Sequence, residues 1–530
     1  MTLQDYLKLR NGSGVRGIAT ENDENQTVTL TQEVAENIAK AFCIWLITRT
    51  GKTQVRVAVG YDSRISSPTL CDGVVNGIIS TGHNVVVTGL STTPSMFMLL
   101  KDSTVQPERY VHGAIMITAS HLPYYYNGLK FFSQTGALEP SDVKEILEIA
   151  ATFRFAETTT FGQRVDLPYL DTYALSLVEK VRAETGEETP LAGKRILVDA
   201  GNGACGFFAD KVLIPLGANV EGSQFLQPDG YFPNHIPNPE NEDAMQSLCK
   251  AVLGAKADFG FIFDGDANRV GVVDENGQAI HKNRFIALIC AILLSEKAGT
   301  IVTDSVTSDG LTRFIEKRKG KHVRFKCGYK NVIDEAIRRN ETGEYCPLAI
   351  ETSRHTALFE NYFISDGAYL ATRLLTAMAK QNASEKTLSD LIADLDEPFE
   401  SLEVRLSFAN DCDFKALSKQ ALEEFEKYAN GLYYANPDKE NYDGIRLCFD
   451  ELHGNGFALV RPSLHEPVLI VHFESESENG VVKMVKDLFY ALRHNAFLDV
   501  SPLENYVKAW RENKVQTLKA KFARELSVQI

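Results

Sequence analysis

The sequence has 530 residues, 44% of them hydrophobic and 24% charged, which is enough for three or four globular domains of about 100–200 residues each. A formal net charge of −15 argues against a nucleic-acid or anionic-membrane partner, although a small anionic substrate can still bind in a locally basic cleft. The nine cysteines form no CxxC pair, the N-terminus lacks the apolar core of a signal peptide, and no apolar run approaches the roughly 20 residues of a membrane span. We therefore expect a cytoplasmic protein with reduced thiols.

Apolar periodicity predicts alternating strands and helices through most of the chain. The first repeat of this order has strands at 55–62, 84–88 and 112–118 and helices at 30–50, 70–81, from 91 and near 168–185. The β-α-β order recurs from 194 and again from 300, and from about 400 it gives way to strand-like segments with helices at 414–429 and 480–494. We expect an α/β protein of three similar layered units and a smaller α+β C-terminal domain, with domains at 1–188, 189–296, 297–399 and 400–530.

The segment TASHLPYYYNGLKFF, residues 118–132, follows a strand and carries the first candidate chemistry. Ser120 and His121 lie where the strand pattern breaks, and Lys130 follows the turn signal Asn127-Gly128. A hydroxyl, an imidazole and an ammonium on one loop suit covalent chemistry on an anion. The alternative is a polar loop with an incidental serine.

The segment FIFDGDANRVGVVDENG, residues 261–277, delivers Asp264, Asp266 and Asn268 at the end of an apolar strand. Three oxygen ligands spaced by two residues suit Mg²⁺, and Arg269 beside them suits a phosphate. An EF-hand is excluded because Arg269 stands where the calcium loop needs glycine and the flanks are strands. An acidic hairpin turn without a metal is the other alternative.

Two GxGxxG patterns point toward a dinucleotide site. The pattern Gly12, Gly14 and Gly17 has no strand before it and fails the Rossmann context. The pattern Gly201, Gly203 and Gly206 follows a strand and is trailed by Glu221 about twenty residues on, which makes a NAD-binding domain an alternative.

Three further groups of polar residues are candidates. Arg16 lies between glycines, in a loop that suits an oxyanion, or else in a flexible turn. Glu351, Ser353 and His355 follow an apolar run and suit neighbouring sugar hydroxyls, although a helix cap is the simpler reading. Arg461, Ser463, Leu464 and His465 form a loop between two strands that suits a phosphate, or else a polar hairpin.

These motifs, in this order and over almost the whole chain, resemble those of the α-D-phosphohexomutase family, the phosphoglucomutases and phosphomannomutases. TASHLPYYYNGLK resembles the phosphoserine loop, DGDANR the metal loop, ETSRH the sugar loop and RPSLHEP the phosphate loop. GSGVRG, VAVGYDSRISSP and GLSTTP resemble further signatures of the family, in which DAGNGACG opens the second domain without a dinucleotide. The resemblance implies four domains around a central cleft.

The resemblance also implies a reaction. Ser120 would carry a phosphoryl group, pass it to a hexose 1- or 6-phosphate and recover the other phosphate from a hexose 1,6-bisphosphate. Mg²⁺ would be held by Ser120, Asp264, Asp266 and Asn268. Arg16 and Arg269 would neutralise charge, and Lys130 would act as general base with His121 as helper. The sugar would be bound by Glu351, Ser353 and His355, and its distal phosphate by residues 461–465.

The chain departs from the family pattern at three places. Asn268 stands where the metal loop usually has a third aspartate, and Arg354 stands where the sugar loop usually has glycine. The phosphate loop has Leu464-His465 where many members have Gly-Thr or Asn-Thr, although a subset resembling bacterial phosphomannomutases has Ser-Leu-His. We expect Arg354 to pair with Glu351, to reach a substrate oxygen or to narrow the sugar pocket.

The two main departures keep a second function open, a catalytically weakened homologue that senses a sugar phosphate. A NAD-dependent enzyme is a third, less favoured alternative. Glucose, mannose, glucosamine and pentose phosphates are not separated by these motifs, and a monomer and a dimer are both compatible with them.

Overall fold

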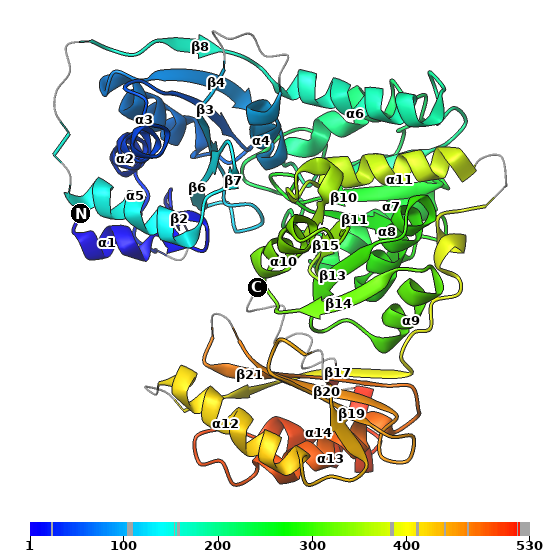
Figure 1. Cartoon of the computed structure of the whole chain (residues 1–530). Coiled ribbons are helices and arrows are strands. Elements are labelled where there is room, and N and C mark those ends of the chain that lie inside the picture. The colour runs from blue at the N-terminus through cyan, green and yellow to red at the C-terminus, as the bar shows by residue number, and fades with distance from the viewer. Residues whose placement is uncertain are drawn as a thin grey trace. The chain divides into compact units, whose positions relative to one another are not determined.

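The computed structural model describes residues 1–22, 25–102, 110–152, 154–155, 160–381, 386–409, 413–438, 441–463, 466–516 and 518–519. The chain forms two compact units (Figure 1). The first unit contains Met1–His281 and Ile364–Leu388, and the second contains Lys282–Phe363 and Ser389–Ile530. Layered α/β structure is visible in both units.

The first unit begins with an eight-stranded sheet, ordered β1-β2-β6-β5-β3-β4-β8 with β7 paired to β6. Its strands are β1 (Arg10–Asn11), β2 (Gly14–Ile18), β3 (Arg56–Tyr61), β4 (Asn84–Leu90), β5 (Gly113–Ile117), β6 (Tyr126–Ser133), β7 (Gly136–Ala137) and β8 (Arg164–Asp166). The helices in this part of the chain are α1 (Leu3–Lys8), α2 (Gln32–Thr50), α3 (Ser67–Ser80), α4 (Thr93–Lys101), α5 (Pro140–Thr152) and α6 (Leu170–Thr185). Because α2, α3 and α5 cover one face of the sheet and Phe97 of α4 packs on Phe132 of the other, both faces are buried.

Two local predictions in this sheet were wrong. Asn127-Gly128 is not a turn but lies inside β6, where a Cβ on Gly128 would lie 2.1 Å from the carbonyl oxygen of Val15. The segment around Arg16 is not a loop either, since it forms β2 and pairs antiparallel with β6, Arg16 lying opposite Gly128. Glycine is needed here because two strands approach closely. From the local sequence alone, a glycine with this role cannot be told from a glycine in a turn.

The second sheet of the first unit has the order β12-β11-β10-β9. Its strands are β9 (Ile196–Asp199), β10 (Phe259–Phe263), β11 (Val270–Val273) and β12 (Ala279–Ile280). The helical segments beside it are a 3₁₀ turn (Ala204–Gly206), a π-helix (Phe208–Leu213), α7 (Glu242–Ala255) and α11 (Gly367–Gln381). The helix expected after the glycine turn is thus a 3₁₀ turn and a π-helix, and α11 returns from later in the chain to pack beside α6 (Figure 1).

The second unit contains two sheets, ordered β14-β13-β15-β16 and β17-β21-β20-β19-β18. The first consists of β13 (Thr300–Asp304), β14 (Lys321–Phe325), β15 (Leu348–Ile350) and β16 (Thr356–Leu358), with α8 (Lys282–Glu296), α9 (Asp309–Lys317), α10 (Tyr329–Glu341) and 3₁₀ turns at Phe359–Asn361 and Ser389–Ile392. The second consists of β17 (Glu400–Ser407), β18 (Ala435–Pro437), β19 (Ile445–Phe449), β20 (Gly456–Pro462) and β21 (Val468–Ser475), with α12 (Phe414–Ala429), α13 (Gly480–Leu492) and α14 (Ser501–Arg511). This last sheet is antiparallel, and Figure 1 shows α12, α13 and α14 on one of its faces.

The predicted fold class is confirmed: three layered α/β units precede a smaller α+β domain. Each of the four predicted domain ranges contains one sheet. However, α8 belongs to the second compact unit and α11 to the first, although the sequence placed them in the second and third ranges. The domain boundaries themselves stay a prediction.

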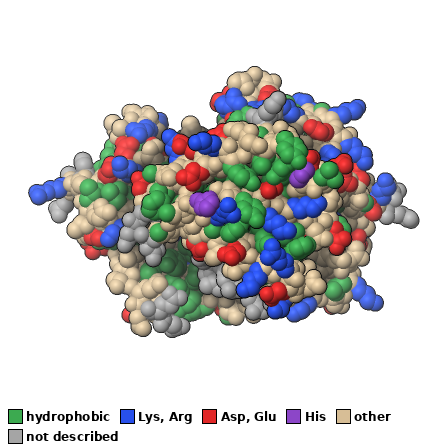
Figure 2. Space-filling view, turned by 90° about the horizontal axis from the view of Figure 1, so that it is seen from below, with side chains coloured by type: hydrophobic (Ala, Val, Ile, Leu, Met, Phe, Trp, Pro, Cys, Tyr) green, Lys and Arg blue, Asp and Glu red, His purple; other side chains and the backbone are tan. Residues whose placement is uncertain are grey.

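The surface carries charges of both signs despite the acidic excess. Figure 2 shows Lys and Arg side chains beside Asp and Glu side chains on one face, with hydrophobic side chains between them. The overall net charge therefore does not describe the charge of any single site. Among the described residues, no helix is long and apolar enough to cross a membrane.

Candidate functional site

The turn that links β5 to β6, residues 118–125 and here called the serine loop, presents Ser120 in a constrained conformation. Ser120 has a left-handed backbone (φ +55°), which is uncommon for a residue other than glycine, and is only 7% exposed. Its amide donates to the Thr118 hydroxyl at 2.8 Å, and its own hydroxyl donates to Asp264 Oδ2 at 3.0 Å. His121 Nδ1 lies 3.5 Å from the same hydroxyl oxygen. The hydroxyl is therefore aimed at the acidic loop described below.

A buried arginine, Arg64, holds the serine loop in this shape. Its guanidinium donates to three carbonyl oxygens of the turn, those of Ser120 (2.8 Å), Leu122 (2.6 Å) and Pro123 (2.7 Å), and to that of Tyr126 (3.0 Å), the first residue of β6. The side chain is fully buried and its Nε donates to Asp62 at 3.2 Å. The same Asp62 accepts from the Thr118 hydroxyl at 2.6 Å, so one buried ion pair fixes both ends of the turn.

The hairpin between β10 and β11, residues 264–269 and here called the acidic loop, places two carboxylates in the interior. Asp264 accepts from Arg269 Nε at 3.0 Å, and Asp266 accepts from Lys130 Nζ at 2.6 Å and from the Thr93 hydroxyl. Burial opposes ionisation of both groups. It raises the pKa of Asp264, whereas at Asp266 the Lys130 ammonium outweighs burial and lowers the pKa. Burial also lowers the pKa of Lys130.

Two polar atoms of the acidic loop suggest what it can bind. Asp266 Oδ1 and Arg269 Nη2 are buried and have no hydrogen-bond partner among the described residues. The side-chain oxygen of Asn268 accepts from Lys130 Nζ at 2.6 Å when its amide is oriented so that Nδ2 donates to the Ser365 carbonyl at 3.2 Å. Carboxylate and amide oxygens that already surround an ammonium suit a hard divalent cation, and a free guanidinium N–H suits a phosphate oxygen.

The glycine turn at Gly201–Gly206 packs against the acidic loop. The amide of Ala204 donates to the Gly265 carbonyl at 3.0 Å, and a Cβ on Gly203 would lie 2.9 Å from Gly265 Cα. A Cβ on Gly265 would in turn lie 2.5 Å from the Ser120 carbonyl oxygen. These glycines allow the glycine turn, the acidic loop and the serine loop to pack together. The backbone of the glycine turn is covered by these protein contacts and does not face a pyrophosphate. This removes the support for the NAD alternative.

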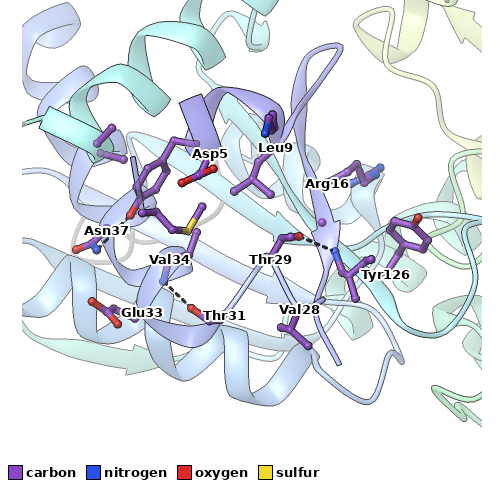
Figure 3. A pocket seen from close by; sticks show the side chains of 17 residues that line it. Asp5, Leu9, Arg16, Val28, Thr29, Thr31, Glu33, Val34, Asn37 and Tyr126 are labelled. Carbon is purple, nitrogen blue, oxygen red and sulfur yellow. Dashed lines mark hydrogen bonds between the residues drawn. The ribbon is translucent and has the colours of Figure 1, made fainter. Parts of the chain in front are cut away.

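A cavity of about 750 Å³ lies at the edge of the eight-stranded sheet, between α1, β2 and the start of α2 (Figure 3). Arg16 and Tyr126 form one wall, and Thr29, whose hydroxyl accepts from the Ile18 amide at 3.1 Å, forms another. Neither Ser120 nor any residue of the acidic loop lines it. The guanidinium of Arg16 donates to the Thr118 carbonyl, so Arg16 lines this cavity and also contacts the serine loop.

A second polar cluster lies in the second unit, at the ends of β13 and β15. Glu351 accepts from the Gly328 amide at 2.7 Å and from the Ser353 hydroxyl at 3.1 Å, and that hydroxyl lies 3.2 Å from His355 Nδ1. The His355 ring stacks on Tyr329, with centroids 5.1 Å apart. Burial and the neighbouring carboxylate of Asp304 raise the pKa of Glu351 to about 7.

The predicted phosphate loop belongs to the same cluster. Arg461 lies in β20, one residue before its end, and is mostly buried. Its charge only partly offsets the burial that raises the pKa of Asp304 and of Glu351. Its Nε lies 4.0 Å from Asp443 Oδ2, which accepts from the Ser305 hydroxyl and the Cys327 amide. The Ser463 hydroxyl accepts from the Glu466 amide at 3.3 Å. Leu464 and His465 lie outside the described residues.

Arg354 does not point to solvent. It keeps the left-handed backbone that glycine would adopt (φ +68°), is 2% exposed, and places its guanidinium over the Phe285 ring of α8 at 6.0 Å. These contacts place the guanidinium in the interior of the second unit. They do not test whether Arg354 narrows the sugar pocket, which stays a prediction.

The structure therefore assembles the candidate residues into one cluster in each unit. The first unit brings together Ser120, His121, Lys130, Arg16, Asp264, Asp266, Asn268 and Arg269. Sequence reasoning missed Asp62, Arg64 and Thr93 here and Asp304 and Tyr329 in the second unit. Two of these, Asp62 and Asp304, are charged residues at the ends of buried strands, a signal that could have found them.

Family models cover most of the chain. The models described as "Phosphoglucomutase/phosphomannomutase, alpha/beta/alpha domain I", domain II and domain III match residues 7–157, 171–277 and 281–399. A phosphoglucomutase/phosphomannomutase of Thermococcus kodakarensis is 30% identical over 479 residues, covering 89% of this chain and 95% of that protein. A phosphomannomutase/phosphoglucomutase of Pseudomonas putida is 29% identical over 437 residues, covering 82% and 86%.

Solved structures agree with the sequence relatives. The crystal structure of a phosphoglucomutase/phosphomannomutase family protein from Burkholderia thailandensis superposes with a TM-score of 0.75 at 25% identity. The match covers 94% of this chain and all of that one.

The anchoring role of Arg64 is tested by Arg64→Met. This change leaves the Asp62 carboxylate buried without its cation and removes the donors for the turn. We expect the free energy of unfolding to fall by about 3–5 kcal/mol, measured by urea denaturation. Arg64→Lys, which keeps the charge but not the fork of donors, should lose less; a methionine variant as stable as the native protein would contradict the assignment.

The buried Glu351 should make stability depend on pH. The pKa is about 7 in the folded chain against a reference value of 4.5, so between these pH values the folded state holds a proton that the unfolded state has lost. Stability from this group is complete below pH 4.5 and is lost as the pH rises through about 7.

Glu351→Gln removes this dependence. The unfolding free energy of the variant minus that of the native protein should rise by about 1–3 kcal/mol between pH 4.5 and pH 8, measured by urea denaturation at several pH values. Parallel pH profiles for the two proteins would show that Glu351 titrates normally.

Proposed function

The chain belongs to the phosphoglucomutase/phosphomannomutase family, and on that premise we propose that it interconverts hexose 1- and 6-phosphates, of glucose, mannose or both, through a phosphoserine at Ser120 and a hexose 1,6-bisphosphate intermediate. One observation carries the assignment of the reacting group. The Ser120 hydroxyl is fixed on a left-handed backbone, 3.0 Å from a buried carboxylate and 3.5 Å from an imidazole. A serine retained only for packing would not need this conformation.

In the proposed reaction the phosphoryl group on Ser120 passes to the free hydroxyl of the bound sugar phosphate. A bond forms between that sugar oxygen and phosphorus, the bond between Ser120 Oγ and phosphorus breaks, and the hydroxyl proton goes to Lys130. The bisphosphate then turns over in the site, and its other phosphate returns to Ser120. Phosphoryl transfer depends mainly on positioning and charge neutralisation, which supports these roles for fixed groups.

Several features of the first cluster support the catalytic assignments. Burial lowers the pKa of Lys130, which favours the neutral amine that a general base requires. Arg269 pairs with Asp264, the carboxylate that accepts from Ser120, and its buried Nη2 has no partner among the described residues. Arg16 contacts the serine loop at Thr118, and His121 is a neighbour of the reacting oxygen.

The oxygen atoms of Asp264, Asp266, Asn268 and Ser120 would hold Mg²⁺. The fit rests on the partnerless Asp266 Oδ1 and on the oxygen atoms that already surround an ammonium. When bound, the ion neutralises phosphate charge and polarises the phosphoryl group. The protein residues themselves fix the geometry, because Asp264 and Asp266 are buried and hydrogen-bonded.

The cluster of the second unit supports sugar recognition. Glu351, Ser353 and His355 form a chain of hydrogen bonds whose carboxyl, hydroxyl and imidazole suit adjacent sugar hydroxyls. Arg461 and Ser463, with Leu464 and His465, would bind the phosphate that is not reacting. A hexose 1,6-bisphosphate would also be the activator, since it phosphorylates Ser120.

The sensor alternative keeps the same sugar-phosphate site but no turnover, and the Ser120 test below separates the two functions. A cytoplasmic location is part of the proposal; the thiols among the described residues are all free and mostly buried, which suits a reducing compartment. A small-molecule hexose phosphate is the proposed partner, without nucleic acid or membrane, for a monomer or a dimer.

Ser120→Ala should abolish turnover of glucose 1-phosphate and mannose 1-phosphate and remove the one covalent phosphate from the intact mass. Folding should be preserved, because the hydroxyl adds little to the core. Ser133→Ala, at the far end of β6, is the matched control. Full turnover by Ser120→Ala, or a phosphopeptide elsewhere, would overturn the assignment, whereas a phosphorylated native protein without turnover would favour the sensor.

Arg461→Ala should weaken sugar-phosphate binding by about ten- to a hundredfold, because charge-assisted hydrogen bonds to phosphate contribute about 1.5–3 kcal/mol. Calorimetric titration with glucose 6-phosphate measures the change. Arg493→Ala removes a guanidinium that lies over the Tyr490 ring at the end of α13 and serves as control. Equal affinities of native protein and Arg461→Ala would move the distal phosphate away from this loop.

A further inference from the structure

The ammonium of Lys130 lies among the oxygen atoms that the proposed function assigns to Mg²⁺. Its Nζ lies 2.6 Å from Asp266 Oδ2 and 3.4 Å from the Thr93 hydroxyl. It also lies 2.6 Å from the Asn268 side-chain oxygen in the amide orientation that lets Nδ2 donate to the Ser365 carbonyl. Two of the metal ligands are thus already engaged by a protein cation. An oxygen atom cannot bind the ion and this ammonium at such distances without bringing two cations into close repulsion.

We propose that Lys130 is a built-in counter-cation of the metal site, which Mg²⁺ displaces when it binds. This inference rests on the proposed function for the identity of the site. The charges support it: the carboxylates of Asp264 and Asp266 are paired one to one with Arg269 and Lys130 before any ion enters. Asn268 adds an oxygen but no charge. While Lys130 stays in place, both carboxylate charges are already compensated. Negative charge for a divalent ion becomes available when Lys130 leaves, or when Ser120 carries a phosphate with a charge of about −1.5 to −2.

The surroundings allow the lysine to leave while the ligands stay in place. The backbone of Lys130 is fixed in β6 between Gly14 and Met116, but its side chain is a flexible four-carbon stem that is 18% exposed. Asp266 keeps other partners: its carboxylate accepts from the Thr93 hydroxyl, and its carbonyl accepts from the Thr93 amide at 3.0 Å. Asn268 keeps the Ser365 carbonyl.

Metal binding and the release of Lys130 are then one event. In the metal-free protein the amine is engaged by Asp266 and Asn268. When the ion takes these oxygen atoms, the amine becomes available for the proposed role as general base. A protein without metal would thus lack both charge neutralisation and a free base.

The test is a calorimetric titration of Mg²⁺ into the unphosphorylated full-length protein, its phosphorylation state verified by intact mass. Lys130→Met removes the competing cation and should bind Mg²⁺ at least about tenfold more tightly than the native protein. Lys130→Arg keeps the charge and should not gain affinity. Native or weaker affinity in Lys130→Met would overturn the inference, and thermal unfolding without metal checks that each variant is folded.

Asn268→Asp provides a second variant, in the native and Lys130→Met backgrounds. Each single change should tighten binding. The gain from the added carboxylate should differ between the two backgrounds, because Lys130 contacts position 268 directly. Strictly additive gains would contradict the direct competition.

A measurement on the native protein avoids any folding defect. Amine acylation followed by mass spectrometry should label Lys130 more strongly when Mg²⁺ is added, while Lys256, at the end of α7, is the internal control. Unchanged or weaker labelling of Lys130 overturns the inference. If Mg²⁺ binds neither the native protein nor any variant, the proposed metal site fails and this inference with it; if it binds the native protein but Lys130→Met does not gain, only this inference fails.

Discussion

The buried ion pair between Arg64 and Asp62 is the constraint on which the first cluster depends. A guanidinium removed from water must satisfy its donors inside the protein, and Arg64 does so with three carbonyl oxygens of the serine loop and that of Tyr126 at the start of β6. The left-handed conformation of Ser120 is therefore maintained by the requirements of a neighbouring cation, and its hydroxyl is directed to Asp264 as a consequence.

The same arrangement of carboxylates recurs in both units. Asp62, Asp264, Asp304 and Glu351 each stand at or just after the end of a buried strand. Helices and neighbouring strands cover these ends, so burial opposes ionisation of all four and the local partners decide the outcome. At Asp62 and Asp264 burial raises the pKa although a guanidinium lies close and opposes it. At Glu351, where a second carboxylate is close, the pKa is raised to about 7. Charge and protonation in these sites are thus set by contacts between segments far apart in the chain.

Glycine has a related structural role in the first unit. Gly128, Gly203 and Gly265 lie where two backbones approach too closely for a side chain. In the sequence, such glycines resemble turn signals or a dinucleotide fingerprint. A short sequence motif does not show which distant backbone segment packs against the glycine. Arg354 illustrates the opposite case, since a bulky residue occupies a left-handed position and is stabilised by burial over Phe285.

The sequence alone determined the elements with strong periodicity and the residues at their ends. Apolar segments predicted strands in each of the four sheets, although not β2 or the course of β6. Polar residues directly after apolar strands predicted Ser120, Asp264 and Glu351 as candidate site residues. Only the tertiary structure decided that Arg16 lies on a strand, that Arg64 anchors the serine loop and that Lys130 reaches the acidic loop. These outcomes depend on the partner at the other end of each contact, which the local sequence does not specify.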